Sequence, residues 1–262
     1  MKKYFSIAKM TILEKLQYFL SNFSSLVMVL MFIYIFLQLW KNIYQGDELI
    51  GGYTLNQMIW YVAITEILWQ TIRPRRMSKE LSKDIRSGKI AYILNKPINY
   101  CLYELFKYIG EAVIGILFFL VFGLPIIYLI VGPLETFSFI SLIPIFVTLI
   151  LSILITGIIY IAISLSAFWL GENKPIFWIY EKLVLIIGTI FPVEVFNLSI
   201  QKLIKLTPIY PTIYAVAKLV VDFSWGKFLE LFIVQIIYLG IVSLICMIIY
   251  KKGVKKLNVN GG

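Results

Sequence analysis

The sequence contains no histidine and only two cysteines, Cys101 and Cys246. Histidine is the commonest metal ligand and the usual proton carrier near neutral pH, so its absence argues against a metal site and against histidine-based catalysis. Cys101 lies at the inner edge of one apolar segment and Cys246 inside another. Because the first thiol would face a reducing compartment and the second would face lipid or packed helices, we expect no disulfide.

A phosphate-binding loop is also absent from the sequence. The run G-x-x-x-x-G-K-[ST], whose backbone amides hold nucleotide phosphates, occurs nowhere in the chain. The pairs Gly51-Gly52 and Gly261-Gly262 are isolated and typical of turns or of a chain end. The clustered acids, histidines or cysteines that a membrane-embedded enzyme would need at one depth are missing as well. We therefore expect this chain not to be an enzyme and to bind no cofactor of its own.

Apolar residues dominate what is present. They make up 60% of the sequence, and the mean hydropathy is +0.89, whereas an ordinary soluble domain holds about half apolar residues. The chain is therefore predicted to be a multi-pass membrane protein. Its net charge of +10 is assigned to loops and tails that face anionic lipid and set orientation, and not to a nucleic-acid partner.

Six segments are apolar over the roughly 20 residues that a membrane-spanning helix requires. We predict an all-α fold in which residues 1–262 form one transmembrane domain with six spans. The predicted spans cover residues 21–40, 55–72, 102–131, 139–170, 176–195 and 228–250. The strongly basic segments (the first 20 residues, the loop 73–100 and the tail after residue 250) then fall on one side, which makes both termini cytoplasmic.

The segment 1–19 combines lysines with apolar residues near helical spacing. This pattern favours an amphipathic helix lying in the inner membrane interface. An irregular basic tail is the alternative.

The loop 73–100 is a charged segment between long apolar runs. It carries eight basic residues against Glu80 and Asp84. A Gly88-Lys89 break, an apolar patch and Lys96-Pro97 follow a helix-like start. A loop that only set topology would need charge but not this order, so we interpret 73–100 as a contact surface. Ordinary topology-setting charge is the alternative.

The segment 189–228 is too apolar for a solvated loop, yet Pro192, Pro208, Pro211 and charges such as Glu194 prevent a continuous span. Short helices that dip into the outer leaflet and return would explain both facts, provided that the broken backbone is buried in protein. The alternative is a loop of interfacial helices anchored by aromatic residues.

Two motifs carry a family resemblance over most of the chain. Residues 84–90 read Asp-Ile-Arg-Ser-Gly-Lys-Ile, residues 94–97 read Leu-Asn-Lys-Pro, and Phe191-Pro192 and Thr207-Pro208 punctuate the outer segment. In this order, these motifs and the predicted topology resemble the membrane subunits of type-two ATP-binding-cassette (ABC) exporters. Asn197 stands where that group often has a second proline, which leaves the shape of the outer turn open.

The resemblance implies several partners. ATP and Mg²⁺ would bind to separate ABC ATPase subunits, and a second permease, identical or related, would complete the transport path. The cell membrane would be the prokaryotic cytoplasmic membrane, and the cargo would be exported, with drug, peptide antibiotic, lipid-linked glycan and ion as open choices. The ATPase-coupling residues by this resemblance are Asp84, Ile85, Arg86, Gly88, Lys89, Ile90, Leu94, Lys96 and Pro97; those of the outer re-entrant segment are Phe191, Pro192, Glu194, Thr207 and Pro208. An ATP-independent secondary transporter is the main alternative, and it would predict an internal repeat.

Charged and polar residues inside predicted spans are costly and often functional. Glu66, with Gln70 one turn later, lies in the span 55–72 and is a candidate for a polar translocation path. A buried interhelical hydrogen bond is the alternative role. Glu104, Lys107 and Glu111 share one helix face, and we expect them to pair with each other. A charged helix face beside the ATPase is the alternative.

Overall fold

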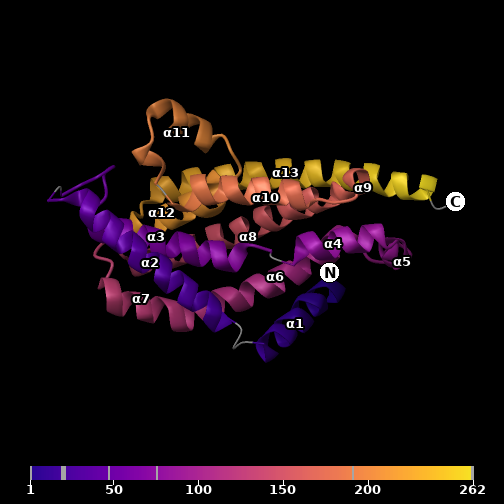
Figure 1. Cartoon of the computed structure of the whole chain (residues 1–262), viewed down its shortest axis with the longest axis horizontal. Helices are drawn as coiled ribbons and strands as arrows, with labels where there is room; N and C mark the ends of the chain where they lie inside the picture. The colour runs from indigo at the N-terminus through magenta and orange to yellow at the C-terminus, as the bar shows by residue number, and fades with distance from the viewer. Residues whose placement is uncertain (1, 19–21, 47, 75, 191, 261–262) are drawn as a thin grey trace.

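The computed structural model describes residues 2–18, 22–46, 48–74, 76–190 and 192–260, so Phe191 lies outside the described part of the chain. Over these ranges the chain is helical, as the sequence predicts (Figure 1), and an isolated bridge pairs Ile50 with Tyr53. The helices are α1 (Lys2–Gln17), α2 (Asn22–Tyr44), α3 (Leu55–Ile72), α4 (Met77–Arg86), α5 (Lys89–Leu94), α6 (Tyr100–Phe118), η2 (Phe119–Gly123), α7 (Leu124–Val131), η3 (Phe139–Ser141), α8 (Leu142–Leu165), α9 (Ala167–Leu170), α10 (Lys174–Val184), η4 (Leu185–Ile190), η5 (Val193–Val195), α11 (Leu198–Lys205), η6 (Tyr210–Tyr214), α12 (Ala215–Val221) and α13 (Trp225–Asn260).

Within the described ranges, four helical stretches are long and apolar enough to cross a membrane: Phe23–Tyr44, Tyr100–Val131, Phe139–Leu170 and Trp225–Lys256. Two other predicted spans behave differently. The 18-residue α3 contains Asn56, Gln57, Glu66 and Gln70, which lower its hydropathy, and the 11-residue α10 continues only through the π-helical turn η4. The chain is thus a multi-pass, all-helical membrane protein.

The helix α3 forms the centre of the molecule. Thr54 and Gln57 close its amino end with a reciprocal capping box, and the Tyr108 hydroxyl donates to the Ile72 carbonyl at 2.6 Å at its carboxyl end. Its neighbours include α2, α6, α8 and α12. Most of its side chains are buried, Thr65 and Glu66 among them.

The helix α1 confirms the predicted amino-terminal helix and lies against α6 (Figure 1). Gly110 permits this approach, because a Cβ there would come within 2.7 Å of the Ala8 carbonyl oxygen. The Tyr4 hydroxyl accepts the Asn99 amide at 2.8 Å, which links α1 to the loop before α6. The opposite face leaves Phe5, Met10, Leu13 and Leu16 exposed, as expected of a helix lying in the membrane interface.

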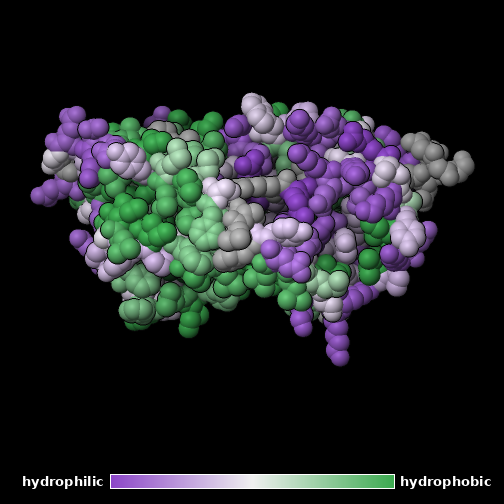
Figure 2. Space-filling view, turned by 60° about the horizontal axis from the view of Figure 1, so that its bottom comes forward, coloured by the Kyte–Doolittle hydropathy of each residue, from purple (hydrophilic) through white to green (hydrophobic). Residues whose placement is uncertain are grey.

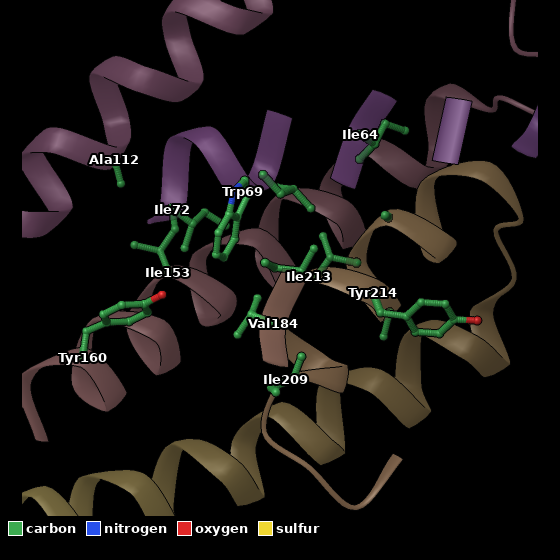
Figure 3. Close-up of a cluster of buried hydrophobic side chains, with 14 of the residues drawn as sticks. Ile64, Trp69, Ile72, Ala112, Ile153, Tyr160, Val184, Ile209, Ile213 and Tyr214 are labelled. Atoms are coloured by element: carbon green, nitrogen blue, oxygen red, sulfur yellow. The ribbon is translucent and has the colours of Figure 1, made fainter. Parts of the chain in front are cut away.

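The segment after α10 contains a broken helix whose second arm, η6–α12, is buried inside the protein. α11 and the η6–α12 pair meet at an 84° bend. Every residue from 211 to 217 is buried, and Ile209 and Ile213 pack beside Val184 and Trp69 in the apolar cluster of Figure 3. Pro208 and Pro211 account for the break, because proline supplies no amide hydrogen and clashes with the preceding turn.

Side chains from other parts of the chain donate to backbone carbonyl groups of the η6–α12 stretch. The Gln235 side-chain amide of α13 donates to the Pro211 carbonyl at 2.9 Å and to the Thr148 carbonyl at 2.9 Å. The Ser152 hydroxyl of α8 donates to the Thr212 carbonyl. At the end of α12, the Thr136 hydroxyl donates to the Val221 carbonyl at 2.6 Å. Irregular backbone at membrane depth is tolerated under this condition.

The two ends of the molecule differ in character. In Figure 1, α4, α5, α9 and the carboxyl terminus lie at one end, and the turn after α2, the end of α7 and the start of α13 lie at the other. Figure 2 shows hydrophobic side chains concentrated over the half that contains the second end, and hydrophilic ones over the half that contains α4 and α5. The loop 73–100 therefore forms most of one polar end.

Replacing Gln235 by Leu should destabilise the fold. The change removes two buried hydrogen bonds, to the Pro211 and Thr148 carbonyls, and a typical hydrogen bond contributes about 0.5–1.5 kcal/mol. Thermal unfolding of the purified protein in detergent should show a lower midpoint. Ile236→Leu, at an exposed neighbouring position of α13, is the matched control and should leave the midpoint unchanged. Equal midpoints for Gln235→Leu and the parent protein would contradict this role.

Candidate coupling loop and polar cleft

The helix α4 has three distinct faces. The first is apolar: Met77, Leu81 and Ile85 recur at i, i+4 and i+8, and all three are buried. They pack on α8 and α9. This face fixes α4 against the membrane helices, which explains why a loop between two spans is ordered.

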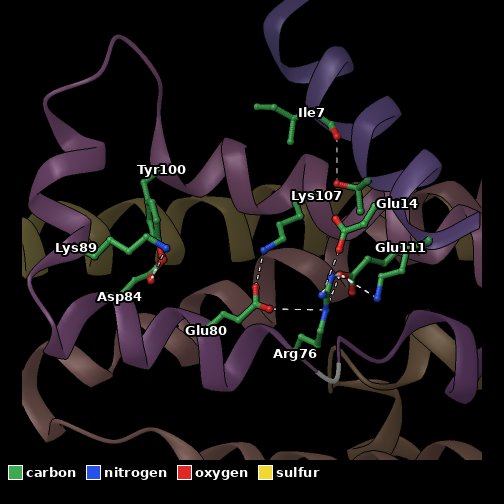
Figure 4. A network of polar contacts seen from close by, with 11 residues as sticks. Ile7, Glu14, Arg76, Glu80, Asp84, Lys89, Tyr100, Lys107 and Glu111 are labelled. Atoms are coloured by element: carbon green, nitrogen blue, oxygen red, sulfur yellow. Dashed lines mark hydrogen bonds and ion pairs between the residues drawn. The ribbon is translucent and has the colours of Figure 1, made fainter. Parts of the chain in front are cut away.

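The second face pairs acids of α4 with cations and a tyrosine (Figure 4). The Lys107 ammonium of α6 lies 2.5 Å from Glu80 Oε2. Asp84 lies 3.3 Å from the Lys89 ammonium and accepts a hydrogen bond from the Tyr100 hydroxyl at 3.5 Å. Both acids of the loop thus have partners within the chain, and they tie α4 to α5 and α6.

Arg76 is the hub of this network. Its guanidinium forms hydrogen bonds with Glu111 of α6 and lies 3.8 Å from Glu14 of α1 and 3.7 Å from Glu80. Lys15 of α1 lies 3.7 Å from Glu111. The prediction that Lys107 and Glu111 pair within their own helix is wrong, because α1 and α4 supply closer partners that helical spacing alone does not reveal.

Protonation of Glu80 links this network to pH. Partial burial alone would raise the pKa of Glu80, but the hydrogen bond and charge of Lys107 outweigh burial and lower it below the ordinary 4.5. A depressed folded-state pKa contributes stability above the unfolded pKa, and that contribution is lost as pH falls through the folded value. The clamp between α4 and α6 is therefore fully charged at neutral pH.

The tip of the loop turns at Gly88, whose φ of 72° is costly for other residues. Ile90 then returns to the core and is fully buried, as Ile85 is nearly so. Tyr92 stays exposed with the Lys96 ammonium 4.6 Å from its ring centroid. The expectation that Ile85 and Ile90 contact a partner is corrected, because both side chains pack inside this chain.

The remaining predicted coupling residues lie at or near the surface. Arg86, Gly88, Lys89, Lys96 and Pro97 are exposed, and Leu94 is half-buried. The Lys3 ammonium of α1 donates to the Pro97 carbonyl, which holds the exit of the loop.

A polar cleft of about 530 Å³ lies between α2, α3 and α10. Glu66 and Gln70 line it from α3, Ser24 and Ser25 from α2, and Lys182 from α10. The sequence pointed to Glu66 and Gln70, and the structure places both in this cleft. Glu66 is only 3% exposed. The side-chain oxygen of Gln70, Oε1, has no hydrogen-bond partner among the described residues.

An ion pair closes the polar end of the cleft. Arg73 Nε and Nη2 lie 2.6 Å and 2.5 Å from the two carboxylate oxygens of Glu181. The Arg73 guanidinium also lies 5.0 Å from the Trp69 ring centroid. Sequence reasoning missed this pair, because its members are 108 residues apart and no local pattern links them.

The outer segment holds a second polar group. Glu194 accepts hydrogen bonds from the Tyr214 hydroxyl of η6 and from the Lys218 ammonium of α12. Pro192 is buried, and Thr207 and Pro208 form the half-buried bend between α11 and η6. Glu194 therefore anchors the start of the segment to its end. Among the described residues, no group of three acids or cysteines is placed to hold a metal ion.

Exchanging the charges of the Arg73–Glu181 pair tests its contribution. Arg73→Glu places two carboxylates together and should lower the unfolding midpoint, since a hydrogen bond to a charged group contributes about 1.5–3 kcal/mol. Adding Glu181→Arg should restore most of the loss. A double variant no more stable than Arg73→Glu in thermal unfolding would show that the pair does not act as a unit.

Comparisons with known proteins agree with this architecture. No curated protein matches the sequence. A family model described as ABC-2 family transporter protein matches residues 24–261. That match takes in every helix from α2 to α13, including the loop 73–100 and the broken segment after α10. The chain therefore belongs to the ABC-2 family of transporter membrane proteins, whose permeases associate with ABC ATPase subunits.

Proposed function

We propose that this chain is one permease of an exporter, that it forms the translocation path with a second, identical or related permease, and that ATP hydrolysis with Mg²⁺ on separate ATPase subunits drives it. One observation carries the proposal: within the loop 73–100, ion pairs clamp α4 and the residue before it to α1 and α6, and α5 presents an exposed tip. A loop that served only to orient the chain would need none of the contacts of Arg76, Glu80 and Asp84.

The proposed topology has six spans, formed by α2, α3, α6 with α7, α8, α10 with η4, and α13. Figure 1 supports this topology, because the connections between successive spans alternate between the two ends of the long axis. The basic loop and the carboxyl terminus share one end, which the positive-inside rule assigns to the cytoplasm. The membrane would be the prokaryotic cytoplasmic membrane, with α1 in its inner interface and residues 192–221 re-entering from outside.

In this proposal the loop transmits movement of the ATPase to α3. Lys89, Tyr92 and Lys96 are exposed and would contact the ATPase. Ile85 and Ile90 would act from behind, by anchoring the loop to the core. A surface of one aromatic ring among cations suits a partner groove that is acidic and partly apolar.

The transport path would form where two permeases face each other across the polar cleft. The cleft is lined by polar groups, namely Glu66, Gln70 and the Arg73–Glu181 pair. In a single permease this cleft would open toward lipid. Charged groups inside membrane helices normally face a protein interior or a water-filled space. A second permease over this cleft would supply that interior, and the cargo would pass beside Glu66.

Changing the loop tip should uncouple the ATPase. Tyr92→Asp with Lys96→Glu removes the exposed ring and reverses a charge; truncating one side of a desolvated contact costs about 2–5 kcal/mol, or roughly thirty-fold to several thousand-fold in affinity. The tagged variant should reach the membrane at normal levels but copurify with far less ATPase. Lys252→Glu, exposed at the end of α13, is the control. Normal ATPase retention by the loop variant would exclude this tip as the contact.

Glu66→Gln should reduce transport while leaving the unfolding midpoint within error of the parent. The amide keeps the shape of a buried carboxyl group but not its ability to ionise, so packing is preserved. Transport by the assembled complex in vesicles is the measurement, with Ile67→Leu on the same helix as the control. Unchanged transport would assign Glu66 to packing alone.

A further inference from the structure

The third face of α4 is basic. Lys79, Lys83 and Arg86 recur at i, i+4 and i+7 and therefore lie on one side of the helix. They line a pocket of about 650 Å³ between α4 and the start of α10, where Lys174 adds a fourth cation. Arg73 lines the same pocket at its junction with the polar cleft.

The other four cations of the pocket, unlike Arg73, have no acid partner among the described residues. Arg73, Arg76, Lys89 and Lys107 all take part in ion pairs, but within the described ranges Lys79, Lys83, Arg86 and Lys174 form none. Two acids line the pocket: Glu181 is held by Arg73, and Glu172 faces the cations alone. The pocket therefore carries a net positive charge that the protein itself does not neutralise.

Two further features indicate a ligand. Ser82 lines the pocket at 3% exposure, and its hydroxyl oxygen has no hydrogen-bond partner among the described residues. Buried hydroxyl groups are normally paired. Trp178 borders the pocket from α10 and is 61% exposed, as is typical of tryptophan at the level of lipid headgroups.

We propose that this pocket binds the phosphate headgroup of an anionic phospholipid of the cytoplasmic leaflet. Lys79, Lys83, Arg86 and Lys174 supply the positive charge, Ser82 supplies a hydroxyl group, and Trp178 lies beside the glycerol and the first acyl carbons. Basic pockets between membrane helices on the cytoplasmic side suit such headgroups. The inference rests on the orientation proposed above but not on ATP-driven transport.

The geometry favours lipid over the ATPase as the occupant. The pocket is concave and is formed partly by α10, the helix that leads into the membrane from this end. The exposed tip consists of Tyr92 of α5 and Lys96 just after it. In Figure 1, α5 lies farther out along the long axis than most of α4. A protein partner that rests on the tip can thus leave the pocket to lipid.

The test is native mass spectrometry of the full-length chain, titrated in detergent with phosphatidylglycerol or with phosphatidylcholine. Each surface cation contributes about fivefold to affinity for anionic lipid. K79Q/K83Q/K174Q should therefore bind phosphatidylglycerol about a hundredfold more weakly, with phosphatidylcholine binding unchanged. K251Q/K252Q/K255Q removes the same charge from the exposed end of α13 and should retain the parent affinity. If the triple variant does not fold, K83Q alone should lose about fivefold.

Three results would overturn the proposal. Equal losses in the two triple variants would reduce the effect to net charge. Displacement of the lipid by water-soluble glycerol phosphate at equal concentration would identify a free phosphate ligand. Parent affinity for phosphatidylglycerol together with loss of the copurifying ATPase would assign this face to the ATPase. Loss of lipid affinity with normal ATPase retention supports the lipid site and leaves the proposed function intact.

Discussion

The position of α4 depends on the ion pairs of Arg76, and much of the polar end depends on α4. One guanidinium contacts Glu111 of α6 and lies near Glu14 of α1 and Glu80 of α4. The side chains are partly exposed, so each pair alone contributes little. These ion pairs matter because they share Arg76: three helices that are distant in the sequence must be in place together for the network to form. The apolar face of α4 then adds the burial that holds the arrangement.

The division of α4 into three faces explains how one short segment can serve several purposes. The apolar face packs on α8 and α9, the acidic face pairs with α5 and α6, and the basic face remains open beside α10. Because these faces follow from helical spacing alone, a single insertion within α4 would rotate all residues beyond it by about 100°. The order of charges in the loop is therefore a structural requirement as well as a determinant of topology.

The sequence predicted the helical fold, the amino-terminal helix and the break in the outer segment, because each has a local signal: apolar length, amphipathic spacing or proline. It placed Glu66 and Gln70 in a polar setting for the same reason. It did not predict that Ile85 and Ile90 turn inward, since an apolar residue in a charged loop can face either its own core or a partner. Gln235 and Ser152 were also missed. Their importance lies in the carbonyl groups of another helix, which no local pattern of α8 or α13 reveals.

The location of Arg73 connects the two polar regions of the protein. Arg73 lines both the cleft that contains Glu66 and the basic pocket beside α4, and its bidentate bonds to Glu181 fix α10 to the end of α3. Only the stretch 73–76 separates the buried helix α3 from α4. In the proposed transport cycle, a displacement of α4 would therefore act directly on the Arg73–Glu181 pair. A lipid phosphate bound to the basic face of α4 would stabilise one position of that helix. Membrane composition would therefore also affect the position of α4 in the proposed transport cycle.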